Sequence, residues 1–303
     1  MTSKQALNTR QESLAGVAYV IPSFLIWGLS PIYWKVLGDV PAFETLMHRV
    51  IWSLLFLLPF LILRTRRHEI LTVLKNRRTV LILIATTFFV GVNWFVFIWA
   101  INHDYVLQAS LGYYMTPLVH VLLGVVFLRE RLRNLQVAAV FLAGFGVVYL
   151  TIQYGQFPWV ALSLAFTFGL YGLIRKVAPV SAVGGLTVEM LFASIPALIY
   201  LFYLETKGMG SLFHISLKID MFLIGTALVT ALPLALFTLG TRRLHLSTVG
   251  FLQYIAPSCF FLLAVFIYHE PISRAQVWTF FLIWAALGVY SIDSVLVYKR
   301  TVR

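Results

Sequence analysis

A charged group lies inside one of the apolar stretches of this sequence, where its type and spacing could do chemistry. Arg49 directly follows His48 in the apolar run 42 to 63, and Glu44 lies shortly before both. A charge in apolar surroundings is costly, so it should face a partner group or a water-filled space. We interpret Arg49 as an anion-binding group. A snorkelling arginine or a structural pair with Glu44 is the alternative.

Three other side chains could exchange a proton. An imidazole titrates near neutral pH, which makes His48 and His120 candidates for proton coupling. Glu189 is a third candidate. The alternatives are a plain hydrogen-bonding role for His48, an interfacial carboxylate for Glu189, and a packing contact made by small residues for the helix face that carries His120.

Several hydrogen-bonding and aromatic side chains could form a small-molecule site around these groups. Interfacial anchoring accounts for aromatic residues near helix ends, but it accounts less well for Trp27 and Asn93, nearer the middle of their runs. An apolar pocket with a few directed polar groups suits a small amphipathic ligand. The candidate substrate-binding residues are Trp27, Arg49, Asn93, Trp94, Tyr113, Thr116, Gln253 and Tyr254.

The elements that must position these residues are long apolar runs. The chain of 303 residues is 60% hydrophobic and only 11% charged, whereas soluble domains carry about a quarter charged residues. Runs long enough to cross a bilayer as helices recur along the whole length. We expect an all-α integral membrane protein with ten transmembrane helices, near 14–36, 42–63, 80–100, 106–127, 134–153, 158–175, 185–203, 221–241, 246–268 and 275–297.

The distribution of Lys and Arg predicts the orientation. Most of the 23 basic residues lie in alternate connections and at the two ends, which places both termini in the cytoplasm. The first apolar run is longer than the core of a signal peptide and contains Pro31, so we expect a retained helix. The net charge of +12 is not gathered on one amphipathic face, so we expect no nucleic-acid partner.

An internal repeat relates the two halves of the chain. "YYMTPL" (113–118) and "QYIAPS" (253–258) align Tyr114 with Tyr254 and Pro117 with Pro257, and the same offset relates Glu130 to Glu270. An odd number of helices in each half would make the second half enter the membrane inverted. We expect a first repeat at 1–153 and an inverted second repeat at 154–303. The two prolines are hinge candidates, and surface ion pairs with Arg131 and Arg274 are the default for the two glutamates.

Other chemistries find little support in the sequence. The single cysteine, Cys259, excludes intramolecular disulfides and a cysteine metal cluster. No zinc-protease helix, P-loop or nucleophile elbow occurs, so we expect neither an enzyme nor a metal or cofactor. Inverted halves are typical of secondary transporters. A membrane-embedded enzyme and a solute channel are the alternatives.

Five motifs resemble the RarD-type branch of the EamA proteins, in the drug/metabolite transporter (DMT) superfamily. They are "HRVIW" (48–52), "GVNWFVFIWAIN" (91–102), "QASLGYYMTPL" (108–118), "FLRERL" (127–132) and "GFLQYIAPS" (250–258). The resemblance covers essentially the whole chain. It implies ten helices in two inverted repeats and a central cavity lined by helices one to four and six to nine.

The same resemblance implies a biological role. It implies residence in the bacterial inner membrane and export of small metabolites or drugs, and the naming of the family refers to chloramphenicol sensitivity. The expected partners are a small-molecule substrate and the lipid bilayer. Coupling to protons is left open, and we expect a monomer or a weak homodimer.

Overall fold

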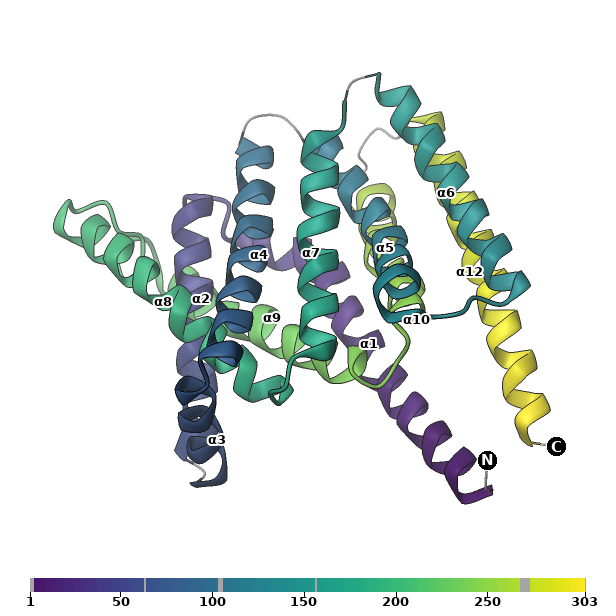
Figure 1. The fold of residues 1–303 in the computed structure, drawn as a ribbon. Helices are drawn as coiled ribbons and strands as arrows, with labels where there is room; N and C mark the ends of the chain where they lie inside the picture. Colours follow the sequence, from purple (N-terminus) through teal and green to yellow (C-terminus); the bar gives the residue numbers. More distant parts are fainter. Residues whose placement is uncertain (1–2, 63, 103–105, 156, 268–272, 303) are drawn as a thin grey trace.

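The computed structural model describes residues 3–62, 64–102, 106–155, 157–267 and 273–302, and within these ranges its regular structure is helical throughout (Figure 1). The prediction of an all-α chain is confirmed. The helices are α1 (Ser3–Val36), α2 (Ala42–Ile62), α3 (Arg64–Lys75), α4 (Arg77–Asn102), α5 (Val106–Leu128), α6 (Asn134–Tyr154), α7 (Trp159–Val177), α8 (Ala182–Thr206), α9 (Leu217–Thr241), α10 (Leu246–Gln253), α11 (Ile255–Leu262), the π-helix η1 (Leu263–Ile267) and α12 (Arg274–Val302).

Nine helices in the described part of the chain are long and apolar enough to cross a membrane, and a shorter apolar stretch, Leu246–Leu262, adds to them. They correspond to the ten predicted spans. The predicted bounds differ by a few residues, and α3 is an additional short helix between the second and third spans. Its sequence begins "RTRRHE", so it is too polar to read as a further span.

The predicted span 246–268 is not one continuous helix. It is interrupted at Tyr254, between α10 and α11. Pro257 has no N–H to donate to the carbonyl of Gln253, and its ring crowds that carbonyl. At the break, the N–H of Tyr254 donates to the carbonyl of Phe251, three residues earlier, over 3.2 Å. Pro117, the repeat-related proline, lies inside the unbroken α5, so the two positions differ in structure.

The helices pack in matched pairs. Helix α1 packs on α9 and on α11, while α7 packs on α4 and on α5; α6 pairs with α12 at one edge of the molecule (Figure 1). If the halves are repeats, α1 corresponds to α7, α4 to α9, and α5 to α10 and α11. Under this correspondence the contacts of α1 with α9 and α11 match the contacts of α7 with α4 and α5. Two five-helix repeats would give this pattern. The boundary between residues 153 and 154 remains a prediction.

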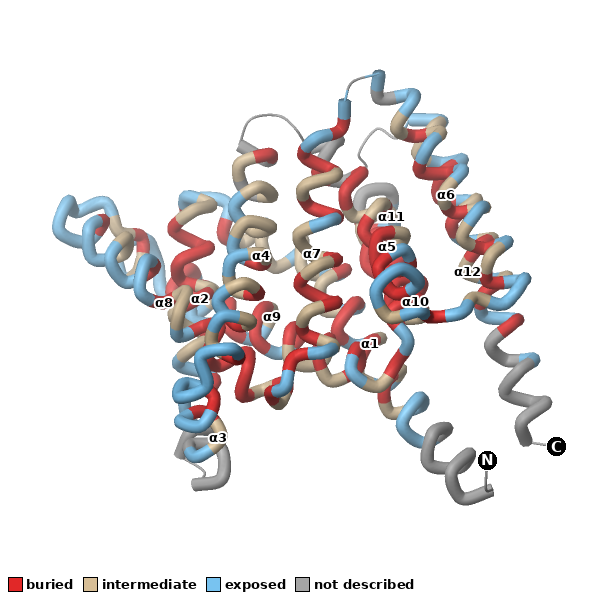
Figure 2. The backbone as a smooth tube through the Cα atoms, viewed as in Figure 1, coloured by how far each residue is buried: buried red, intermediate tan, exposed pale blue. Residues whose placement is uncertain are grey.

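The outer surface is apolar. Along α6, α8 and α12 the outward faces are largely exposed (Figure 2), and they carry large side chains such as Phe141 (75% exposed), Phe202 (73%) and Phe281 (62%). A soluble monomer rarely exposes apolar patches of this extent. This surface suits contact with lipid chains.

Two helices approach closely through glycines. A Cβ atom on Gly240 of α9 would lie 2.1 Å from Cγ2 of Val20 and 2.8 Å from the carbonyl oxygen of Gly16, both on α1. Small residues at a crossing let two helix backbones meet without intervening side chains. The contact between α1 and α9 therefore depends on glycine at this position.

Glu130 joins the connection after α5 to the start of α10. Its carboxylate accepts hydrogen bonds from the backbone N–H groups of Leu246 (2.5 Å) and Ser247 (2.9 Å) and from the hydroxyl of Ser247 (2.7 Å). Burial alone would raise the pKa of Glu130, but the bonds from His245, Ser247 and Leu246 outweigh it and lower the pKa to about 2. The predicted surface ion pair between Glu130 and Arg131 is wrong, because within the described residues Glu130 is engaged by these other groups. Glu270 lies outside the described residues.

Candidate functional site

Arg49 lies where several helices of the bundle meet. Its Nε donates a hydrogen bond to Oγ1 of Thr230 on α9 over 3.1 Å. Its guanidinium carbon lies 4.7 Å from the ring centre of Trp34 on α1 and 4.8 Å from that of Trp94 on α4. Both distances are within the range of cation–π attraction. The alternative of a structural pair between Arg49 and Glu44 does not hold in the described structure.

Tyr113 extends this cluster toward the broken helix. The Tyr113 side chain, on α5, is close enough to Arg49 to interact with it electrostatically. Its ring centre lies 5.8 Å from Phe97 of α4 and 5.2 Å from Phe260 of α11 in edge-to-face arrangements. Arg49 and Tyr113 are both only partly buried, so the cluster retains accessible surface although helices from both halves of the chain surround it.

Two other substrate-binding candidates make contacts that hold helices together. Asn93 donates from its side-chain nitrogen to the Leu164 carbonyl (2.9 Å) and to Oγ1 of Thr167 (3.0 Å), which joins α4 to α7. The Thr116 hydroxyl donates to the Gly112 carbonyl in its own helix over 2.7 Å. The amide hydrogens of Asn93 and the hydroxyl hydrogen of Thr116 are thus already engaged within the protein.

A compact aromatic cluster lies next to these helices. Trp27 of α1 contacts Phe168 (5.7 Å between ring centres) and Phe237 (5.8 Å), and His120 lies 6.0 and 6.1 Å from the same two rings. The Nδ1 atom of His120 is 2.7 Å from Oε1 of Gln253, so this pair joins α5 to α10. Three predicted residues, Trp27, His120 and Gln253, are therefore brought together. Trp27 and Trp94 pack against the same hydrophobic cluster, which connects this group to the surroundings of Arg49.

Tyr254 lies apart from both groups. It is fully buried in a hydrophobic cluster built by α5, α6, α10 and α12, together with Tyr114 and Phe280. The repeat relates Tyr254 to Tyr114, and the structure indeed places these two in one cluster. Their position suits packing at the edge of the bundle, and Tyr254 contributes nothing to the surroundings of Arg49.

His48 belongs to a small polar group near the start of α2. Its Nε2 lies 3.7 Å from Oε1 of Glu44. The Glu44 carboxylate also accepts from the backbone N–H (2.6 Å) and the hydroxyl (2.9 Å) of Ser211, in the connection before α9. His48 and Glu44 thus form a buried pair, which could exchange a proton.

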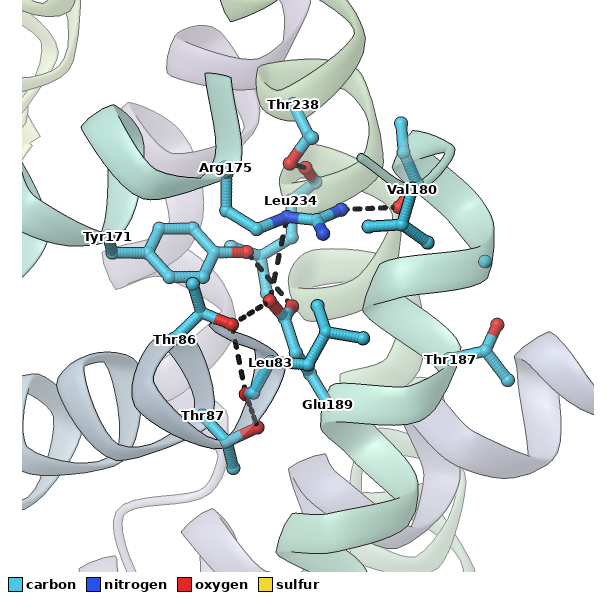
Figure 3. A network of polar contacts seen from close by, with 12 residues as sticks. Leu83, Thr86, Thr87, Tyr171, Arg175, Val180, Thr187, Glu189, Leu234 and Thr238 are labelled. Carbon is cyan, nitrogen blue, oxygen red and sulfur yellow. Dashed lines mark hydrogen bonds and ion pairs between the residues drawn. The ribbon is translucent and has the colours of Figure 1, made fainter. Parts of the chain in front are cut away.

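Glu189 lies at the centre of a buried polar network (Figure 3). Its carboxylate accepts from the Thr86 hydroxyl over 2.6 Å and from the Tyr171 hydroxyl over 3.3 Å, and Nε of Arg175 lies 3.5 Å from Oε1. Arg175 also donates from Nη2 to the Ala182 carbonyl over 2.7 Å. Both charged side chains have no exposed surface, so the alternative of an interfacial carboxylate at Glu189 is wrong.

The two arginines lie toward opposite ends of the bundle. Arg175 is near the end of α7, on the side where both chain termini lie (Figure 1). Arg49 is in the first half of α2 and Trp34 is near the end of α1, so both lie toward the other side. Between them lie the rings of Phe168 and Phe237, which also pack on Tyr171 (5.9 and 6.4 Å).

Sequence patterns carried only partial signals for three of these residues. Trp34 shares a helix face with Trp27, but its place near the end of the run favoured an interfacial anchor. Arg175 ends an apolar run beside Lys176 and so resembled a cytoplasmic base. Thr230 is one of several threonines in α9, and no pattern distinguished it.

The arrangement contains groups suited to binding a small molecule. Within the described residues, no group of three or more His, Cys, Asp and Glu side chains could hold a metal ion. The Arg49 cluster offers guanidinium donors and aromatic rings, which bind a solute without reacting with it. The His48–Glu44 pair adds a titratable group nearby.

A protein-family comparison identifies the first half of the chain. The model of the EamA-like transporter family matches residues 14–152. That range contains Arg49, Trp94 and Tyr113.

Full-length relatives extend the similarity. The chain is 44% identical to the uncharacterized transporter YojE of Bacillus subtilis, over 94% of this chain and 96% of that protein. It is 38% identical to protein RarD of Escherichia coli, over 98% and 99% of the two chains. The chloramphenicol-sensitive protein RarD of Pseudomonas aeruginosa is 29% identical, over 95% and 97%.

A solved crystal structure shares the fold. It superposes with a TM-score of 0.70 and covers 93% of this chain and 97% of its own, at 18% sequence identity. At that identity the likeness concerns the arrangement of the helices alone.

Proposed function

We propose that this chain, which belongs to the RarD-type branch of the EamA-like transporter family, is a secondary active transporter of small metabolites or drugs that works by alternating access. As a multi-pass transporter of the DMT type it has a small-molecule substrate and a lipid environment. We place it in the bacterial inner membrane with both termini in the cytoplasm. A relative named for chloramphenicol sensitivity makes that drug one candidate to test.

The observation that carries this proposal is the unequal burial of the two ends. The Arg49 cluster receives side chains from α1, α2, α4, α5 and α9 and stays partly accessible. The Arg175–Glu189 pair at the other end is fully buried. Greater accessibility at one of these two sites than at the other is what one state of an alternating-access cycle requires.

The proposed repeats supply the second state. If 1–153 and 154–303 are inverted copies, exchanging their conformations would seal the Arg49 end and open the Arg175 end. Pro257, at the break between α10 and α11, and Pro117 in α5 are the proposed hinge positions. A single chain contains both halves, so a monomer suffices, and a weak homodimer is the other state we consider.

Proton coupling is a separate part of the proposal. His48 with Glu44, His120 with Gln253 and Glu189 with Arg175 are the three candidate groups. Each links two parts of the bundle or two charges, so a change of protonation could favour one state over the other. Solute flux that leaves the luminal pH unchanged and does not respond to a pH gradient would refute this part.

Transport by reconstituted protein tests the proposal. Proteoliposomes should take up or exchange members of a labelled metabolite and drug panel, chloramphenicol included, with saturable kinetics, and Arg49→Ala should abolish this flux while the protein stays folded. A folded protein inert toward the whole panel would contradict a transporter. Flux that never saturates would favour a channel, and turnover of a solute in detergent would favour an enzyme.

A further inference from the structure

Arg49 differs in its surroundings from three arginines that pair with carboxylates. Arg175 pairs with Glu189 at 3.5 Å and Arg243 with Glu12 at 3.1 Å, and Arg133 pairs with Asp293. Among the residues that the structure describes, no carboxylate contacts Arg49. Glu44, the nearest acid along the chain, is engaged by His48 and Ser211. A cation removed from water and lacking a counter-charge favours the entry of an anion.

The guanidinium of Arg49 keeps donors available. Thr230 uses only Nε, and Nη1 and Nη2 make no hydrogen bond within the described residues. Because Arg49 is only partly buried, its two terminal nitrogens can reach a solute. A planar guanidinium presents parallel N–H donors that match the two oxygens of a carboxylate.

The rings around Arg49 define what the rest of the solute must be. Trp34 and Trp94 lie against the guanidinium, and Tyr113 continues the aromatic surface to Phe97 and Phe260. Such rings favour flat apolar groups through stacking and edge-to-face contacts. A strongly hydrated polyol or a small inorganic ion would leave these rings without partners.

We infer that the transported solute is an organic carboxylate with a flat apolar body, held by Arg49 through its carboxylate and by Trp34, Trp94 and Tyr113 through its body. This rests on the proposed transport function. The two indole rings partly compensate the arginine charge within the protein. Bulky cations and neutral sugars are excluded as preferred substrates.

Matched probes separate charge from shape on the unaltered protein. Phenylacetate and phenylacetamide have nearly the same shape but differ in charge, phenethylamine carries the opposite charge, and phenyl phosphate tests a different oxyanion. Binding to purified full-length protein is measured by calorimetry and by quenching of tryptophan fluorescence. We expect phenylacetate to bind at least roughly tenfold more tightly than the amide, as a charge-assisted pair would give.

Variants assign that preference to Arg49. Arg49→Gln should remove the difference between phenylacetate and phenylacetamide, and Arg49→Lys should retain part of it. Arg243→Gln is the matched control, because Arg243 also lies over an aromatic ring, Tyr19 at 5.2 Å, but is already paired with Glu12; it should leave the preference unchanged.

Several outcomes would overturn the inference. Equal binding of acid and amide, tighter binding of phenethylamine or phenyl phosphate, an unchanged preference in Arg49→Gln, or no binding of phenylacetate up to about 10 mM would each do so. Saturable transport of a neutral or cationic solute would refute the carboxylate and leave transport standing. Arg49-dependent binding of phenylacetate without any flux would refute transport and leave the carboxylate site standing.

Discussion

Arg49 and Arg175 show two ways of keeping a guanidinium within a membrane bundle. Arg175 has no exposed surface, lies 3.5 Å from Glu189, and occupies space left by Gly185, whose Cβ would otherwise lie 2.0 Å from Nη1. Arg49 is partly accessible and has tryptophans and a threonine as neighbours. A compensated charge binds helices to one another, whereas an uncompensated charge is available to a solute.

Breaking the compensated pair should have the largest effect. Glu189→Gln leaves Arg175 as a buried charge without a counter-ion, so we expect the free energy of unfolding to fall by about 3–5 kcal/mol. Thermal unfolding in detergent measures it. The double variant Arg175→Met/Glu189→Met, which removes both charges, should recover much of the loss; a stable Glu189→Gln protein would show that the pair is dispensable.

Removing the uncompensated charge should act on flux and hardly on stability. Arg49→Gln breaks the hydrogen bond to Thr230 and two cation–π contacts, but it also removes a partly buried charge that has no counter-ion. Because these effects offset each other, the free energy of unfolding should change by no more than about 1 kcal/mol. Flux of a bound carboxylate should fall by roughly 10- to 100-fold, the worth of a charge-assisted bond. If the free energy of unfolding falls as far in Arg49→Gln as in Glu189→Gln, the two arginines have the same structural role and the comparison fails.

The tryptophans beside Arg49 should contribute a smaller share. Trp94→Leu removes a ring expected to contact the flat body of the probe, an aromatic contact worth about 0.5–1.5 kcal/mol, so probe affinity should drop by roughly 2- to 13-fold. Calorimetric titration with phenylacetate gives the value. Trp278→Leu is the control, because Trp278 on α12 is 59% exposed on the outer surface, and its affinity should match that of the wild type.

Glu130 sharpens the comparison as a buried charge compensated mainly by N–H and O–H donors. Its pKa of about 2 lies below its ordinary value of 4.5, so the folded state favours the ionised form. The resulting stability is fully present above about pH 4.5 and is lost as the pH falls toward about 2. Unfolding temperatures measured from pH 6 to pH 3 should fall less steeply in Glu130→Gln than in wild type; parallel curves would exclude Glu130 as the cause.

Apolar length and charge placement were enough to predict the all-helical architecture, because each span must satisfy its own backbone hydrogen bonds in lipid. They were not enough to predict the break at Tyr254. Pro117 and Pro257 occupy equivalent sequence positions, and the packing around each helix decides whether the lost hydrogen bond becomes an interruption. The short helix α3 was missed because its polar sequence resembles a loop.

The site was predictable in part. Arg49, Trp94 and Tyr113 stood out as polar or aromatic groups away from the helix ends, and the structure brings them together. The buried pair of Arg175 with Glu189 was missed, because a base at the end of an apolar run is ordinarily solvated and its partner comes from another helix. Tyr254 was misplaced because repeat symmetry gives its depth but not the direction in which its side chain points.

The glycine crossing of α1 and α9 has a mechanical consequence. Gly240 has no side chain, so the carbonyl oxygen of Gly16 and Cγ2 of Val20 pack directly against its backbone. Sliding one helix along the other would move Val20 off Gly240 and against bulkier residues of α9, whereas tilting about the contact point moves no atom far. In the proposed rocking motion of the two halves, this crossing would be the fulcrum.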